Sequence, residues 1–277
     1  MTTPLPMTTG RWIALAVGLP VVLAFIGWAG LTEVALAGQA SYPVRLAVPV
    51  QGSTVSLTAG PADVRVTEAA GSELRLTGTA RYSLIRSTVT WHRTPSGVTV
   101  SPQCHFVTGV CSFSLHAVLP AGKRAIISTG SGDTTLRGLS GAVSAGTGAG
   151  DIRAEDLPGS VTIETGSGDV TAAGLSGPHV TVSTGSGSIG IAGLAGARVS
   201  VSTGSGDIAL TFTRVPVHVR VSASSGSVTL VLPPGPARYQ VNATTDSGSR
   251  TVQVPQTSAP AHVITVTAGS GDISITN

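Results

Sequence analysis

The sequence predicts an all-β protein, a β-solenoid with rungs of about 19 residues, an N-terminal β cap and one preceding transmembrane helix. Two observations predict the solenoid: the string Gly-Ser-Gly-Asp returns at regular intervals, and alternating apolar residues flank each copy. The helix is predicted by a single uncharged run near the N-terminus. With 36 glycines in 277 residues, 41% hydrophobic residues and 10% charged residues, the composition suits many tight turns around an apolar core and excludes a disordered chain.

The repeat is clearest at the residue that follows each Gly-Ser-Gly turn. Successive copies of this position are separated by 18, 18, 19, 19 and 20 residues. An interval near 19 residues is typical of one rung of a β-solenoid. A weaker copy precedes the series at 56–66, and a degenerate one follows it at 246–249. The corner positions are Asp63, Asp133, Asp151, Asp169, Ser188, Asp207, Ser227 and Asp272.

Strands are predicted on both sides of each turn. Before one turn Val180 and Val182 alternate with polar residues, and after it Ile189 and Ile191 do the same. Side chains of a strand alternate between faces, so the apolar set points to one side. An antiparallel meander of hairpins would use the same turns, but the constant phase of the pattern favours the solenoid. A second corner carries leucines expected to close the interior, at Leu139, Leu157, Leu175 and Leu194.

The turn residues are expected to be structural. Glycine adopts positive φ without penalty, so Gly-Ser-Gly can reverse the chain at each rung edge. Aspartate or serine can accept hydrogen bonds from the N–H groups of its own turn. The predicted turn residues are Gly130, Gly132, Asp133, Asp151, Gly166, Gly168, Asp169, Gly185, Gly187, Gly204, Gly206, Asp207, Gly269, Gly271 and Asp272.

The uncharged run from Trp12 to Leu31 is long enough for a helix to cross a bilayer core of roughly 30 Å. Arg11, the one nearby cation, favours a cytoplasmic N-terminus in the cell membrane and an extracytoplasmic remainder. Signal-peptide cleavage after "ALA" at 35–37 is the alternative, and it exports the same region. The predicted organisation is a cytoplasmic stub 1–10, a single-pass span 11–31, a tether 32–43, a β cap 44–127 and a repetitive solenoid 128–277.

The two cysteines, Cys104 and Cys111, are expected to form a local disulfide because the chain is predicted to be exported. A metal site would have to add His105 and His116, and this spacing fits no zinc pattern.

The sequence predicts no catalytic, cofactor-binding or metal-binding residues. One carboxylate per rung supplies too few oxygens for calcium. The acids outside the corners form no pair typical of a hydrolase, and the six histidines are scattered along the chain. A net charge of +3 without a basic run, together with 4% aromatic residues, argues against a nucleic-acid partner.

Two segments suggest partners. Arg81, Arg86, Trp91 and Arg93 could bind an anionic envelope polymer, or they could belong to an ordinary cap strand. The chain ends on a regular rung, 263–277, which would leave an unpaired sheet edge. That edge could dock a second copy or an envelope protein by strand addition, unless short strands and the terminal carboxylate protect it.

The strings "TGSGD" at 129–133, 165–169 and 203–207, with the cysteine-bearing segment 88–113, give the chain a family resemblance. It resembles the bacterial envelope proteins classed as "putative adhesin" domains of unknown function. The resemblance implies a single N-terminal span, a right-handed β-helical region and a non-enzymatic envelope role. We therefore expect a membrane-anchored, adhesin-like structural or interaction module. The alternatives are an accessory sensor of the envelope state acting through a membrane partner and, less favoured, a carbohydrate-active enzyme.

Overall fold

The computed structural model describes residues 39–83, 85–104, 111–258 and 261–277. The described part is all-β, and the β-solenoid predicted from the sequence is confirmed. None of the described residues form a helix with the length and apolarity that a bilayer crossing requires. The predicted span 11–31 and stub 1–10 lie outside the described residues.

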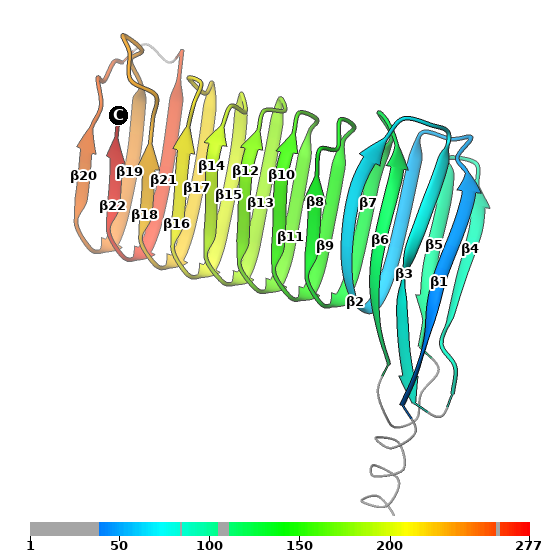
Figure 1. Ribbon diagram of the computed structural model, residues 1–277. Helices are drawn as coiled ribbons and strands as arrows, with labels where there is room; N and C mark the ends of the chain where they lie inside the picture. The colour runs from blue at the N-terminus through cyan, green and yellow to red at the C-terminus, as the bar shows by residue number, and fades with distance from the viewer. Residues whose placement is uncertain (1–38, 84, 105–110, 259–260) are drawn as a thin grey trace, which may run out of the picture.

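Two facing sheets, A and B, build the solenoid, and each rung supplies one strand to each (Figure 1). Successive rungs pair in parallel, which excludes the antiparallel meander. The regular strands of sheet B are β7 (Arg124–Ser131), β9 (Val143–Ala149), β11 (Val161–Ser167), β13 (His179–Ser186), β15 (Arg198–Ser205) and β17 (His218–Ser225). Those of sheet A are β8 (Thr134–Arg137), β10 (Ile152–Leu157), β12 (Val170–Leu175), β14 (Ile189–Leu194), β16 (Ile208–Phe212) and β18 (Val228–Val231).

The core lies between the sheets as columns of apolar side chains in register. Val161, Val180 and Val199 are one such column, and each is almost completely buried. Each strand therefore buries its alternate residues against the facing sheet and against the rungs beside it. The predicted leucine plugs are confirmed, because Leu139, Leu157, Leu175 and Leu194 are 0–1% exposed.

The first rung is β2 (Thr54–Ala69), a long strand that bends through both sheets. Its first half pairs with β7 in sheet B and its second half with β8 in sheet A, both in parallel. The weak sequence copy at 56–66 is therefore a complete rung. The predicted boundary between cap 44–127 and solenoid is corrected accordingly, because the solenoid begins inside that cap region.

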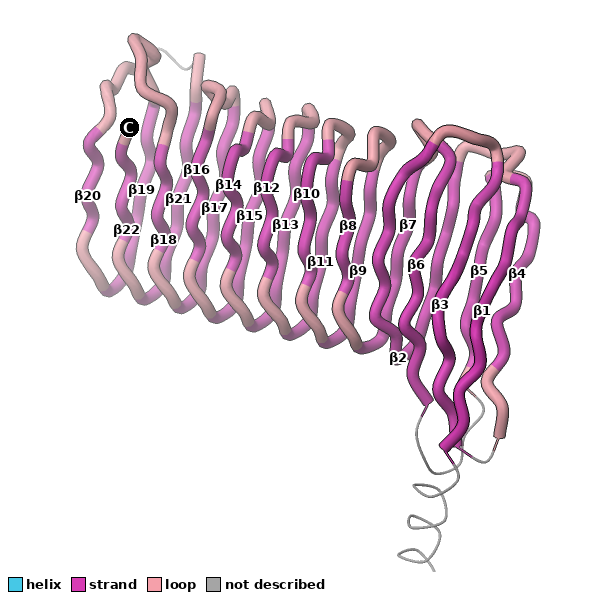
Figure 2. Tube along the Cα trace, viewed as in Figure 1, coloured by secondary structure: helices cyan, strands magenta, loops and turns pink. Residues whose placement is uncertain are grey.

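The cap itself extends both sheets beyond β2. In sheet A, β6 (Cys111–Pro120) pairs in parallel with β2, followed by antiparallel β3 (Glu73–Ser83) and β1 (Gln39–Pro49). In sheet B, β5 (Gly97–Gln103) pairs in parallel with β2 and antiparallel with β4 (Thr88–Thr94). Residues 39–43, expected to be part of the tether, instead form the beginning of β1. Most of the cap is thus an insertion between two rungs that are neighbours in space (Figure 2).

The C-terminal rung, β21 (Val263–Ser270) and β22 (Ile273–Thr276), is not the last in space. It lies between β17/β18 and an outer rung formed by β19 (Gln240–Ser247) and β20 (Arg250–Gln253), as Figure 1 shows for β18, β22 and β20. The expectation that the C-terminal rung presents an unpaired edge is therefore wrong. That edge belongs to β19 and β20.

Burial explains this order. The buried residues of the C-terminal rung are all apolar and 0–2% exposed: Ile264, Val266, Ala268, Ile273 and Ile275. The outer rung has exposed Arg250 in register with Ile273, and only partly buried Val241 and Val252. A polar rung costs the least stability at the end of the solenoid, because only one of its sides contacts another rung. The degenerate copy, β19 and β20, therefore covers the C-terminal end of the solenoid.

The inserted rung makes a stability prediction. Ile275 and Val252 occupy the same register position in adjacent strands, but only Ile275 is fully buried. Ile275→Ala should lower the free energy of unfolding by about 2–5 kcal/mol through loss of burial and a cavity. Val252→Ala should cost about 1 kcal/mol, because its side chain is partly exposed. Urea unfolding of both variants measures the two costs, and equal or reversed costs would contradict the rung order.

Candidate functional site

The Gly-Ser-Gly-Asp corners form one continuous row along the solenoid. The Asp133 Oδ1 accepts a hydrogen bond from the Asp151 backbone N–H at 3.0 Å, and the Asp151 Oδ1 accepts one from the Asp169 N–H at 2.9 Å. Serine does the same less closely, since the Ser188 Oγ lies 3.4 Å from the Asp207 nitrogen. In spatial order the row is Asp63, Asp133, Asp151, Asp169, Ser188, Asp207, Ser227, Asp272 and Ser249.

This row corrects the predicted role of the turn acids. The side chains accept from the next rung rather than from the N–H groups of their own turn. At each corner the neighbouring backbone groups bond to carbonyls of the adjacent rung, as Gly168 N–H does to the Ser186 carbonyl at 2.9 Å. The N–H of the corner residue itself points toward the preceding rung, as that of Asp169 does, and the carboxylate of that rung accepts its hydrogen bond. The acids thus continue the parallel ladder around the bend.

The glycines allow the corners to stack. Gly168 has a φ of 148°, and a Cβ there would lie 2.1 Å from the Gly150 carbonyl oxygen. Gly166, without a positive φ, is restricted by space alone, since its Cβ would lie 2.5 Å from the Gly148 oxygen. The glycine directly before each corner position has positive φ: Gly132, Gly150, Gly168, Gly187, Gly206, Gly226, Gly248 and Gly271.

A buried threonine, which was not among the predicted turn residues, completes the motif. The Thr184 hydroxyl donates to the Gly168 carbonyl at 3.1 Å, and the Thr203 hydroxyl donates to the Gly187 carbonyl at 3.0 Å. These side chains continue the inward face of the preceding strand, two residues after a buried valine. The alternation of the strand therefore predicts that this threonine points inward. Every residue of Thr-Gly-Ser-Gly-Asp therefore serves the contact between adjacent rungs, the serine through its backbone carbonyl.

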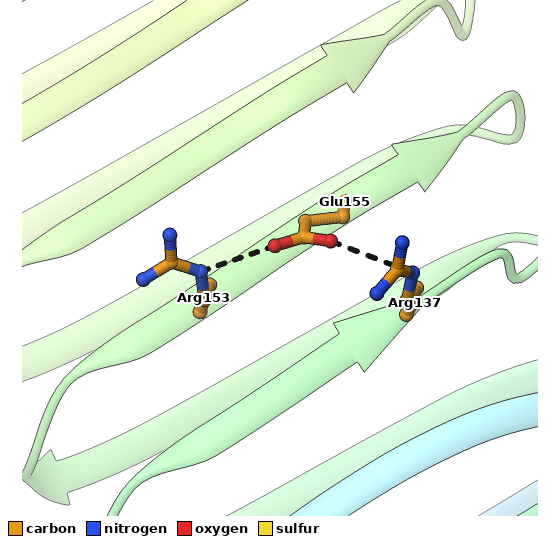
Figure 3. Close-up of polar contacts among 3 residues, drawn as sticks. All are labelled: Arg137, Arg153 and Glu155. Atoms are coloured by element: carbon orange, nitrogen blue, oxygen red, sulfur yellow. Dashed lines mark hydrogen bonds and ion pairs between the residues drawn. The ribbon is translucent and has the colours of Figure 1, made fainter.

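Glu155 is another structural acid. Its carboxylate lies between two arginines, 3.1 Å from the Arg153 Nε and 3.5 Å from the Arg137 Nε (Figure 3). Arg137 occupies the same register position on the neighbouring strand, so the ion pair links two rungs. The next residue, Asp156, has a φ of 56° at a place where a later rung has Gly174. Aspartate is among the few residues that tolerate this conformation.

The Cys104–Cys111 disulfide is confirmed, with 5.9 Å between the two Cα atoms. Both cysteines pack partly buried against the core. His105, named in the metal alternative, lies outside the described residues. Across the described ranges, no three histidine, cysteine, aspartate or glutamate side chains are grouped as metal ligands would be.

The arginine- and tryptophan-containing segment is divided between the two sheets. Arg81 lies on β3 in sheet A, whereas Trp91 and Arg93 lie on β4, the edge strand of sheet B. Arg86 stacks over the Tyr42 ring with its Cζ 4.3 Å from the centroid. Trp91 is 41% exposed. The structure therefore does not combine all four residues into one patch.

The structure gathers a different basic cluster on the outer face of sheet B. His179, Arg198 and His218 stand in register at the beginning of three adjacent strands, and Arg220 follows two residues after His218. They line a shallow groove of about 370 Å³. The histidines are scattered along the sequence, but three of the four residues of this cluster share one rung position. The signal was their rung phase, since each of the three aligned residues precedes its corner position by nine residues.

The stacked corners predict which glycines tolerate a side chain. Gly168→Ala should lower the free energy of unfolding by at least about 2 kcal/mol, because positive φ and a carbonyl contact both oppose the new methyl group. Gly190→Ala is the matched control: its Cβ would meet nothing within 4 Å, so the change should be neutral or slightly stabilising. Urea-unfolding midpoints compare the two, and a neutral Gly168→Ala would contradict the assignment.

The outermost corner predicts a pH effect. The pKa of Asp272 is lowered by hydrogen bonds from the Ser249 backbone N–H at 2.8 Å and from the Ser249 hydroxyl at 2.9 Å. A lowered pKa stabilises the folded state above the unfolded value of about 3.9, and this contribution is lost as pH falls through the folded value. The intrinsic-rate-corrected protection of the Ser249 amide should therefore decrease at the acid end of a hydrogen-exchange titration. Asp272→Asn should remove that decrease, and an unchanged titration would contradict the assignment.

Comparison with known proteins adds the family. No curated protein shows a significant match to the chain. Two crystal structures are similar: "a putative adhesin" from Parabacteroides merdae ATCC 43184 (14% identity, 86% of this chain and 95% of that one, TM-score 0.43) and "a putative cell adhesion protein" from Clostridium sporogenes ATCC 15579 (11% identity, 86% and 99%, TM-score 0.28). Residues 123–276, which include the rungs after β2, match the family described as Toastrack DUF4097. The chain therefore belongs to the Toastrack DUF4097 family.

Proposed function

We propose that this protein is a non-enzymatic, membrane-anchored interaction module whose solenoid lies outside the cytoplasm, in the cell envelope. The observation that carries the proposal is the use of the repeated carboxylates. The carboxylates that recur at the corners accept hydrogen bonds that join one rung to the next. What the rungs leave free is an extended surface, which is the part of a repeat protein that binds partners.

The non-enzymatic part is supported by two further acids outside the corners. Hydrolases on β-helices need carboxylates that are free to transfer protons. Glu155 is paired with two arginines. Glu68 accepts hydrogen bonds from the Ser140 hydroxyl at 2.7 Å and the Ser140 backbone N–H at 2.8 Å, so it joins β2 to the second corner of the next rung.

The location is supported by the cysteines and the N-terminal sequence. A disulfide such as Cys104–Cys111 persists in oxidising compartments and is rare in the cytosol. The uncharged run Trp12–Leu31 has the length of a membrane span, with Arg11 before it. Both observations favour a cytoplasmic N-terminus and an exported solenoid.

A pair of reporter fusions after Asn277 tests this topology. A reporter active only outside the cytoplasm should be active, and one active only in the cytosol should be silent. Replacing residues 12–31 with a polar sequence should reverse the result, because the apolar run is the proposed export signal. Cytosolic activity of the unaltered fusion would contradict the proposal.

A further inference from the structure

The outer face of sheet B has a groove that is lined by positively charged side chains and by no acid. It crosses the beginning of β13, β15, β17 and β21, where His179, Arg198 and His218 are in register and Arg220 lies diagonally from Arg198. All four side chains are exposed. In β9, β11, β13, β15, β17 and β21 the single acid is Glu164, whose register partner Ser183 is four residues along β13 from His179. The groove therefore has two permanent positive charges and no nearby acid on its own sheet.

Arg198 and Arg220 differ from two arginines of the opposite face. On sheet A, Arg137 and Arg153 share the carboxylate of Glu155. Within the described residues, no ion pair is found for Arg198 or Arg220. Two guanidinium groups on adjacent strands repel each other unless an anion lies between them, and their planar donors suit a carboxylate or phosphate. The charge of the groove is therefore complementary to an external anion.

The surroundings point to a carbohydrate. The rest of the outward surface near the arginines is formed by hydroxyls, including Thr181, Ser200 and Thr265. Hydroxyls can both donate to and accept from the hydroxyl groups of a sugar. Two fixed positive charges are few for a polymer with a phosphate on every unit, which binds through many cations at once. They suit a chain with alternating or widely placed charges and many hydroxyl groups.

The periodicity of the groove suits an extended polymer. Adjacent strands are about 4.8 Å apart, so the four strands span roughly 14 Å along the solenoid axis. The outward groups of these strands lie at the same height, because the register is constant from β13 to β21. A linear chain lying along the axis would meet one rung per sugar residue. A groove this shallow and open holds such a chain from one side.

We infer that this groove, defined by His179, Arg198, His218 and Arg220, binds an acidic polysaccharide with carboxylate groups, laid across the rungs. Arg198 and Arg220 pair with the carboxylates, the two histidines flank Arg198 as hydrogen-bonding groups, and the hydroxyls of sheet B contact the sugar rings. This inference names the partner chemistry of the proposed interaction module and rests on that proposal for its biological setting.

Binding of defined oligogalacturonides to the full chain in detergent tests the inference. Wild type should bind, and Arg198→Ala/Arg220→Ala should weaken binding at least tenfold. The matched control is Arg137→Ala/Arg153→Ala, which removes the same charge from sheet A and should leave affinity unchanged. Methyl-esterified oligogalacturonides should bind at least tenfold more weakly, because they lack the carboxylates.

Four outcomes would overturn the inference: no binding by wild type, equal binding by the sheet B variant, equal loss in the sheet A control, or tighter binding of inorganic polyphosphate than of the uronide. Both double variants should keep the wild-type circular dichroism spectrum and unfolding midpoint, because none of the four arginines is buried. The reporter fusions do not depend on these arginines. A failed binding experiment therefore leaves the topology proposal standing, and a failed topology experiment leaves the binding result standing.

Discussion

The fold depends on hydrogen bonding between each rung and the next, maintained around a sharp corner. A parallel ladder pairs its backbone groups easily along straight strands, but a bend turns one N–H of each rung out of the ladder. Here the side chain of the preceding corner residue accepts that N–H, as Asp133 does for Asp151. The requirement recurs at every rung, so the same five residues recur as well. A single substitution at one corner acts on two rungs because donor and acceptor belong to different ones.

The same constraint explains the two ends of the solenoid. An end rung has ladder bonds on one side only, and the unpaired row must be protected or covered. At the N-terminal end, the inserted strands β3 to β6 and the initial strand β1 extend both sheets beyond the first rung. At the C-terminal end, the chain places its polar copy, β19 and β20, outside and returns to fill the gap with its apolar copy. Order in space follows burial rather than order in sequence.

The corner ladder also determines where binding chemistry can occur. Because the corner acids and the inward side chains serve the rungs, only the outward faces of the two sheets are free to vary. On sheet A, the outward residues Arg137 and Arg153 pair with Glu155 of the same sheet. Sheet B leaves Arg198 and Arg220 without an ion-pair partner among the described residues. Because the register is constant, outward residues that change at the same position of successive rungs come to lie side by side in a row.

The sequence by itself determined the rung length, the alternation of buried and exposed residues, the leucine plugs and the Cys104–Cys111 pairing, because each depends on local spacing. Only the tertiary structure decided which rungs are neighbours. Val228 pairs with Ile273, 45 residues further along the chain, and no local pattern encodes that choice. The tertiary structure also decided which N–H each corner acid accepts, because the donor lies on another rung. The alignment of His179, Arg198 and His218 became a shared surface once parallel stacking fixed the register, because equal phase brings residues together only when consecutive rungs pair.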